Sequence, residues 1–247
     1  MIERMNLTEK IMNFLATFLG LKKRWADLSV STESSSASLC YAITVCNEAD
    51  ELRKLLTLLS QYKREGDMIL VQKDQNHVSA EVLTVLDQFA ELVDHQVIFA
   101  LNDDFASFKN NLLKNTSSDY IFQLDADELP SPYLLEHIHS IIAQNPQVEA
   151  FRLPRINLIR QENQSLLVWE DMDGIAPSEY YHFPDYQYRI FKHIPSIYWH
   201  KRVHEVIIGY KTYTLLPKDA KYAILHAKYQ SKQEKQLRYY SELKKKS

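Results

Sequence analysis

Four strand-like apolar runs, each followed by a helix-like pattern, constrain the fold more than any other feature. The strands are expected at residues 39–46, 67–71, 97–101 and 120–124, and the helices at 49–62, 79–92, 105–115 and 132–144. Strands that alternate with helices in this way are typical of parallel sheets. The sequence therefore predicts an α/β domain with a doubly wound, mostly parallel sheet and helices on both faces.

The rest of the chain has a different character on either side of this region. After residue 145 the periodicity weakens and aromatic residues become frequent. We expect short strands at 150–158, 186–191, 197–199 and 221–225, a long loop at 160–183 and a polar helix at 231–246. Loops of that length are usually functional or disordered.

Residues 7–25 have apolar side chains at helical spacing, followed by Lys22, Lys23 and Arg24. This pattern predicts an amphipathic helix, which either lies on a membrane surface or docks on its own domain or on a partner. Serines dominate residues 29–38 and indicate a flexible linker. We therefore expect residues 1–38 to form a helix and linker, and residues 39–247 to form the folded domain.

Composition excludes several classes of protein. The net charge of −3 does not favour nucleic acid as a partner. The chain has 4 glycines and no glycine-rich phosphate loop, so any phosphate must be recognised by a metal ion and side chains. Cys40 and Cys46 lie in an apolar run, which favours buried, reduced thiols. No apolar run is long enough to span a membrane, and no cleavable signal is evident, so a cytoplasmic location is expected.

Three carboxylates, Asp125, Asp127 and Glu128, directly follow the fourth predicted strand. Because burying an unpaired carboxylate is costly, we expect all three to face a crevice at the carboxyl end of the strand. Ligands bind at this edge of open α/β sheets. Clustered oxygens there suit Mg²⁺ or Mn²⁺ shared with a substrate diphosphate. A pair of helix-capping aspartates before Pro130 is the alternative.

Three sequence blocks resemble the family 2 glycosyltransferases, which have the GT-A fold. The blocks are residues 41–48, which end in Asn47-Glu48; residues 105–128, from the Lys109-Asn110 pair to Asp125-Ala126-Asp127; and Arg189-Ile190-Phe191 with His204-Glu205. Residues 183–189 and 226–240 look closer still to small bacterial and phage transferases of surface glycans. The resemblance covers roughly residues 39–240.

The resemblance implies a metal-dependent, inverting, hexosyltransferase-type enzyme. It would move a sugar from a nucleotide-diphosphate donor to a hydroxyl of a surface glycan or lipid-linked acceptor, as in polysaccharide or lipopolysaccharide biosynthesis. Residues 39–128 would hold the donor and the metal, and residues 129–240 the acceptor. The enzyme would be cytoplasmic, with a possible peripheral contact at the inner face of the membrane.

The resemblance also implies roles for residues 125–128, called the acidic turn below. Asp125 would contact the ribose or sugar, and Asp127 the metal, Mn²⁺ or Mg²⁺. His226 resembles the histidine that completes metal coordination in many such enzymes, and an imidazole suits Mn²⁺ better than Mg²⁺. A structural role is the alternative for His226.

Further residues are candidates on the same resemblance. Glu205 would be the general base that takes the proton of the acceptor hydroxyl, at the start of an acceptor-side helix. Its rivals are Asp171, Asp173 and Asp185, and His204 is expected to pack or orient. The candidates for nucleotide-sugar binding are Asn47, Glu48, Asp74, Lys109, Asn110 and Arg189. Asp74 only approximates the residue that reads the base in this family, so the base stays open.

Other functions remain possible on the sequence alone. A nucleotidyltransferase would share the sheet and the metal carboxylates, but it should carry a basic, glycine-rich loop where Asn47-Glu48 stands. A non-catalytic module that binds a nucleotide sugar would keep the site without turnover. A purely structural role would satisfy Asp125 and Asp127 with caps and salt bridges.

Overall fold

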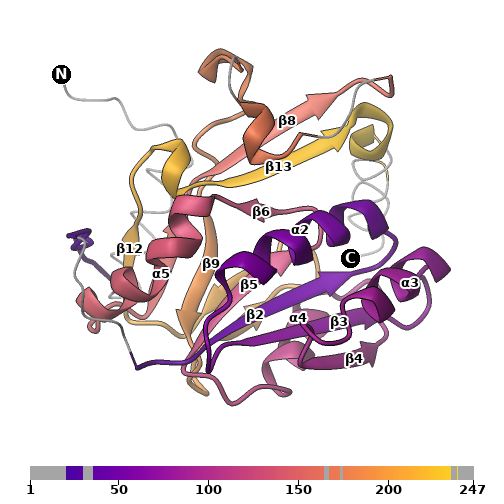
Figure 1. The fold of residues 1–247 in the computed structure, drawn as a ribbon. Helices are drawn as coiled ribbons and strands as arrows, with labels where there is room; N and C mark the ends of the chain where they lie inside the picture. The colour runs from indigo at the N-terminus through magenta and orange to yellow at the C-terminus, as the bar shows by residue number, and fades with distance from the viewer. Residues whose placement is uncertain (1–20, 30–35, 164–166, 173–174, 235–237, 239–247) are drawn as a thin grey trace.

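The structure is a computed structural model that describes residues 21–29, 36–163, 167–172, 175–234 and 238 (Figure 1). Most of the predicted amphipathic helix and of the serine-rich linker lies outside these residues. Residues 21–29 include a short strand, β1 (Lys22–Lys23), which pairs with a strand of the second half. Among the described residues, no helix has the length and apolar character needed to cross a membrane.

A mixed sheet of eight strands forms the centre of the described chain. Its order is β1, β12 (Thr212–Leu215), β7 (Ala150–Leu153), β9 (Gln187–Lys192), β5 (Tyr120–Asp125), β2 (Leu39–Val45), β3 (Met68–Asp74) and β4 (His95–Phe99). Within this sheet β9 is antiparallel to both neighbours, and the other pairs are parallel. The predicted α/β class and mostly parallel sheet are confirmed.

Helices cover both faces because alternate residues of each strand point to opposite sides. Tyr41 and Ile43 pack in one core with the leucines of α2 (Ala49–Tyr62). The helices α3 (Ala80–Gln88) and α5 (Pro132–Gln144) complete that layer. Cys40 and Ala42 pack in the other core, against α4 (Phe105–Leu113). Cys40 is buried, as predicted, Cys46 is partly buried, and both thiols are free.

The helix starts follow local capping chemistry. Ser131 accepts a hydrogen bond from the backbone N–H of Leu134 at 3.0 Å, as its position before α5 predicts. Ser79 caps α3 in the same way through Val82. Ser79 also lies beside the carboxyl end of β2, because its N–H donates to the carbonyl of Cys46.

Two predicted strands of the second half are present, as β9 and as β10 (Tyr198–His200), and the other two differ from the prediction. The segment 150–158 forms two strands, β7 and β8 (Arg155–Arg160), because Pro154 lies between them and cannot donate to a ladder. The chain leaves the large sheet there and joins a three-stranded sheet of β6 (Leu129–Pro130), β13 (Ile224–Tyr229) and β8. Figure 1 shows β8 and β13 together, separated from β2, β3 and β4 by α2.

Two further predictions are wrong in detail. Residues 220–222 are a 3₁₀ turn, so the strand predicted at 221–225 begins at Ile224 and His226 lies inside it. Glu205 does not begin a helix. It lies in the loop of a hairpin formed by β10 (Tyr198–His200) and β11 (Val206–Ile208). The short hairpin had no periodicity that the sequence could reveal.

Candidate functional site

Asp125 is the last residue of β5, and its neighbour across the sheet is Thr44 of β2. The Thr44 hydroxyl donates to Asp125 Oδ1 at 2.8 Å. Because the strand ends at this residue, the Asp125 side chain keeps 35% of its surface exposed. The carboxylate therefore lies at the carboxyl edge of the parallel strands, where the sequence predicted it.

Two nearly buried cations hold Asp125. Lys109 Nζ of α4 lies 3.3 Å from Oδ1, and Arg189 Nη2 of β9 lies 3.2 Å from Oδ2. Burial alone would raise the pKa of Asp125, but the charges of Lys109 and Arg189 outweigh it and hold the pKa well below its usual range. The structure thus brings three predicted site residues into one cluster.

Glu128 has a different environment from the one predicted. Its side chain is 0% exposed, and Oε1 contacts Arg189 at 2.6 Å and Arg155 of β8 at 3.0 Å. The expectation that it faces a crevice is wrong, because two arginines from distant strands neutralise it inside the protein. Burial would raise its pKa, but Arg189 and Arg155 lower it. Glu128 is therefore a structural anion that ties β8 and β9 to the acidic turn.

Asp127 faces β13. Oδ2 of Asp127 lies 3.6 Å from Nε2 of His226, and Nδ1 of His226 lies 2.7 Å from Oδ1 of Asn157 on β8. Burial lowers the pKa of His226 although Asp127 opposes this, so the imidazole is neutral near pH 7. A neutral ring that donates from Nδ1 to Asn157 presents the lone pair of Nε2 toward Asp127.

A second basic residue of β13 approaches the same carboxylate. Lys228 Nζ lies 3.3 Å from Oδ2 of Asp127. Burial would raise the pKa of Asp127, whereas His226 and Lys228 hold it well below its usual value. Since the imidazole is neutral near pH 7, Lys228 is the cation within ion-pair distance of Asp127 there, and Lys232 adds positive charge from farther away.

The side chains around Asp127 provide some, but not all, of the ligands that a divalent ion needs. Among the described residues, no group of three or more His, Cys, Asp or Glu side chains is placed to hold a metal. Asp127 and His226 supply one oxygen and one nitrogen, and Asn157 orients the imidazole as second-shell partners do. Ions that complete their coordination with substrate phosphates need only one or two protein ligands. The pair therefore fits an ion that arrives with a diphosphate.

Glu205 reaches the same cluster from the hairpin loop. Its Oε1 lies 2.8 Å from Lys109 Nζ, so one ammonium group joins Glu205 to Asp125. The surrounding turn is tight, because Lys201 and His204 both have positive φ. The loop thus places the Glu205 carboxylate beside the cluster of Asp125, Lys109 and Arg189.

Two predicted binding residues make structural contacts instead. The side-chain amide of Asn110 donates to the carbonyl of Trp199 and accepts from its N–H, each at 2.8 Å, which fixes the hairpin on α4. Asp74 is 2% exposed and accepts from the N–H of Leu101 and from His77 Nδ1. Neither side chain joins the cluster around Asp125.

Asn47 and Glu48 form the turn between β2 and α2. The Glu48 carboxylate accepts the backbone N–H groups of Cys46 and Asn47 at 2.9 and 3.0 Å. Lys232 lies 3.8 Å from Glu48 and 3.0 Å from Glu51. The turn is therefore closed by its own glutamate and linked to the segment that follows β13.

The rivals of Glu205 are placed differently. Asp185 is engaged by Arg155 at 2.6 Å and by Asn157 at 3.0 Å. Asp171 is exposed in a 3₁₀ turn and accepts the N–H of Val168. Asp173 lies outside the described residues. Among the described acids, Glu205 is the one that Lys109 joins to Asp125.

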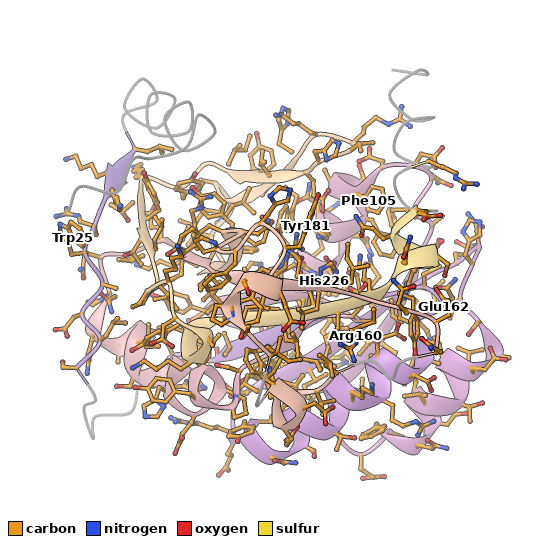
Figure 2. All side chains as sticks on the ribbon, turned by 90° about the horizontal axis from the view of Figure 1, so that it is seen from above. Trp25, Phe105, Arg160, Glu162, Tyr181 and His226 are labelled. Atoms are coloured by element: carbon orange, nitrogen blue, oxygen red, sulfur yellow. The ribbon has the colours of Figure 1, made fainter. Side chains whose placement is uncertain are left out.

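Sequence reasoning missed Lys228, Arg155 and Asn157. One signal was present, because His226 and Lys228 are two residues apart in a strand-like run and so share a face. Arg155 and Asn157 share a face of β8 in the same way. Figure 2 shows His226 near the middle of the molecule. The partners of Lys228, Arg155 and Asn157 lie about 30 to 100 positions away in the chain, and periodicity does not reveal such distant contacts.

Comparison with known proteins identifies the family. The sequence model of "Glycosyl transferase family 2" matches residues 40–208, more than half of the chain. The chain belongs to this family. The match ends before β13, so His226 and Lys228 lie beyond it. No curated protein sequence matches the chain.

Several solved structures resemble the chain at low sequence identity. S. aureus TarS (residues 1–349) has 11% identity and a TM-score of 0.44, over 76% of this chain and 57% of TarS. Mannosyltransferase PcManGT from Pyrobaculum calidifontis, in complex with GDP-Man and Mn²⁺, has 18% identity and a TM-score of 0.41, over 59% and 43%. Glucosyl-3-phosphoglycerate synthase from Mycobacterium tuberculosis has 12% identity and a TM-score of 0.40, over 57% and 52%. The chain thus spans 57% or less of each.

Proposed function

We propose that this family 2 chain transfers a sugar from a nucleoside-diphosphate donor to a hydroxyl group of a glycan or lipid-linked acceptor. The observation that carries the proposal is the pair of carboxylates at the end of β5. Asp125 is held by Lys109 and Arg189, and Asp127 faces the nitrogen of His226. This edge of a parallel sheet is where α/β proteins bind ligands.

Asp127 and His226 would hold Mn²⁺ or Mg²⁺ together with the donor diphosphate, and the mixed oxygen and nitrogen pair favours Mn²⁺. The ion, when bound, would neutralise the charge that grows on the departing diphosphate. Asp125, fixed by two cations and by Thr44, would orient the ribose or the sugar. Among the first-half candidates, Asn47 and Glu48 would shape the floor of the nucleotide site. A nucleobase contact from β3 would fall to the loop after Asp74, because Asp74 itself points inward.

Glu205 would act as the general base of an inverting transfer. Lys109 contacts Oε1 of Glu205 and also Asp125, which keeps the base next to the sugar-binding carboxylate. The base takes the proton of the acceptor hydroxyl while the oxygen attacks the anomeric carbon and the diphosphate leaves. Glu205→Gln should lower kcat by about 10²–10⁴-fold, while Asp171→Asn serves as the control acid.

An exposed aromatic side chain beside the site supports a glycan acceptor. Tyr181 is 52% exposed, and its backbone pairs with Asn157, which holds His226. Sugar rings present C–H faces that pack on aromatic rings. Tyr181→Ala should raise the KM for a glycan acceptor without changing the KM for the donor.

Residues 22–25, three basic residues and a tryptophan, support a peripheral contact with an anionic membrane. Trp25 is 89% exposed and stands at the edge of the molecule (Figure 2), and Lys22, Lys23 and Arg24 are exposed beside it. Tryptophan favours the membrane interface, and each basic residue adds about 1 kcal/mol near anionic lipids. Trp25→Ala with Lys22→Gln and Lys23→Gln should reduce partition to anionic vesicles. Equal partition of both proteins would remove this proposal.

Nucleotide binding tests the main proposal directly. Thermal unfolding would be measured with UDP, GDP, CDP and TDP, each with and without Mn²⁺, for the wild type, Asp127→Ala and Asp50→Ala. A nucleotide at 100 times its Kd stabilises the folded state by about 2.7 kcal/mol, or roughly 5–10 °C for a chain of this size. We expect one nucleotide to stabilise the wild type and the surface control Asp50→Ala most strongly with metal, and to lose the metal-dependent part in Asp127→Ala.

Other outcomes favour other functions. If no nucleotide shifts a folded wild type, the transferase proposal fails and a structural role moves ahead. If a nucleotide sugar binds but is neither transferred nor slowly hydrolysed, the chain is a binding module. Release of pyrophosphate from a nucleoside triphosphate would instead indicate a nucleotidyltransferase.

A further inference from the structure

We propose that Lys228 is a built-in cation of the donor site, which pairs with Asp127 while the site is empty and with a diphosphate oxygen when the donor is bound. The proposal rests on the proposed function and adds a residue to its diphosphate site. Lys228 lies outside the residues matched by the family model.

The strand geometry aims Lys228 at the carboxylate that would hold the metal. His226 and Lys228 are two residues apart on β13 and share one face. Both reach the same oxygen, since Oδ2 of Asp127 lies 3.6 Å from Nε2 of His226 and 3.3 Å from Nζ of Lys228. The ammonium group thus stands beside the position that a metal ion shared by Asp127 and His226 would take.

The contact of Lys228 with Asp127 differs from the structural ion pairs of the cluster. Arg155 and Arg189 approach Glu128 at 3.0 and 2.6 Å, around a carboxylate with no exposed surface. Lys228 approaches Asp127 at 3.3 Å, and both side chains keep 10% of their surface exposed. The Asp127 carboxylate can therefore be reached by a ligand, whereas the Glu128 carboxylate is closed in.

Charge balance then requires Lys228 to change partners. A divalent ion on Oδ2 would place two cations on one carboxylate oxygen, and like charges at that distance repel. A diphosphate brings at least two negative charges to the same place. The lysine ammonium is a compact charge on a flexible four-carbon stem, so it can turn from Asp127 to a phosphate oxygen without movement of β13.

Lys232 also adds positive charge near Asp127, but its ammonium group is held by two other acids. Lys232 is held by Glu51 at 3.0 Å and by Glu48 at 3.8 Å, which are two acids of the turn and helix after β2. Of the two lysines, Lys228 is the one whose contact is with a residue of the metal pair. The prediction that follows is specific: the protein retains some affinity for a nucleoside diphosphate without metal, and Lys228 supplies it.

Binding measurements on the full chain test this prediction. The affinity for UDP, GDP, CDP and TDP would be measured by calorimetry in EDTA and again in Mn²⁺, for the wild type, Lys228→Gln, Lys228→Arg and the surface control Lys114→Gln. A charge-assisted contact is worth about 1.5–3 kcal/mol, so Lys228→Gln should weaken binding in EDTA by about tenfold or more. The loss in Mn²⁺ should be smaller, and Lys228→Arg should restore binding in EDTA.

Binding of Mn²⁺ alone gives an independent readout. The ion should bind Lys228→Gln more tightly than the wild type, because no ammonium group then competes for Asp127, and electron paramagnetic resonance of free Mn²⁺ measures this. If Lys228→Gln changes neither value, Lys228 is only a structural partner and the inference is overturned. If the wild type binds a nucleotide in Mn²⁺ but none in EDTA, the inference alone fails. If it binds no nucleotide in either, the proposed function fails with it.

Discussion

The two halves of the domain, which meet at the acidic turn, are built on different principles. Before the turn, regular strands and helices bury leucines and valines, and Asp125 ends the last of these strands. After the turn, short strands change sheet and bring charged side chains back to it: Arg155, Arg189, Glu205, His226 and Lys228. The first half therefore ends in the carboxylates Asp125, Asp127 and Glu128, and the second half supplies most of the partners of these three.

The largest expected effect comes from a comparison of two buried carboxylates. Glu128 is neutralised by two arginines of the second half, and Asp74 accepts hydrogen bonds within the first half. Glu128→Ala removes the anion that Arg155 and Arg189 share and leaves them with Asp185 and Asp125. We therefore expect a loss at the low end of the about 3–5 kcal/mol that breaking a buried ion pair costs. Asp74→Ala in the first half removes an acceptor of backbone N–H groups and of the largely exposed His77, which costs about 1–3 kcal/mol. Urea unfolding of both variants measures the two losses.

An equal loss of unfolding free energy in the two variants would contradict this expectation. The charged side chains of the second half would then contribute no more to stability than backbone hydrogen bonds do. A second variant, Glu128→Gln, checks the cause. It should recover part of the stability lost in Glu128→Ala, because the amide keeps an acceptor oxygen for the two arginines and fills the same space.

The sequence predicts the first half because its signals are local. The leucines of α2 recur at helical spacing, and the predicted helix 49–62 matches Ala49–Tyr62. The apolar run that forms β2 ends within one residue of the prediction. Asp125 and Asp127 could be placed at the sheet edge because a strand that ends in acids has few other arrangements.

The second half could not be predicted to the same depth. Strands of two to four residues, such as β6 and β12, are too short to show a period. The change of sheet at Pro154 and the hairpin under Glu205 depend on contacts across the fold. Burial of Glu128 was missed for the same reason, since the arginines that permit it lie on β8 and β9.

A smaller effect is expected from two glycines with positive φ. Among the described residues, each half of the domain has one such glycine. Gly209 follows β11 with φ of 87°, and an added Cβ would lie 1.6 Å from the carbonyl oxygen of Ser196. Gly66 precedes β3 with φ of 88°, and nothing lies within 4 Å of its added Cβ. Gly66→Ala should cost about 1–2 kcal/mol from backbone strain alone, whereas Gly209→Ala adds a clash with backbone.

The hairpin beside Gly209 also carries Glu205, so the two variants should differ in activity. Gly209→Ala should lower kcat because the hairpin must shift to relieve the contact, and Gly66→Ala should leave kcat unchanged. Thermal unfolding and steady-state kinetics measure both effects. Loss of stability in Gly209→Ala with full activity would show that the position of the hairpin does not control the proposed role of Glu205.

The smallest test compares two helix caps that have the same chemistry but different neighbours. Ser79 and Ser131 each accept a hydrogen bond from a backbone N–H three residues ahead. Ser131 also donates to the carbonyl oxygen of Lys221, just before β13. Losing a serine cap costs about 1 kcal/mol, and losing a further hydrogen bond costs about 1 kcal/mol more.

Ser131→Ala should therefore destabilise the protein by about twice as much as Ser79→Ala, as measured by urea unfolding. The extra loss has a functional consequence, because the contact with Lys221 fixes the start of the strand that carries His226 and Lys228. Ser131→Ala should weaken nucleotide binding slightly, and Ser79→Ala should not. If the two variants are equal in both measurements, β13 keeps its place through its pairing with β6 and β8, and the hydrogen bond from Ser131 to Lys221 does not help to position His226 and Lys228.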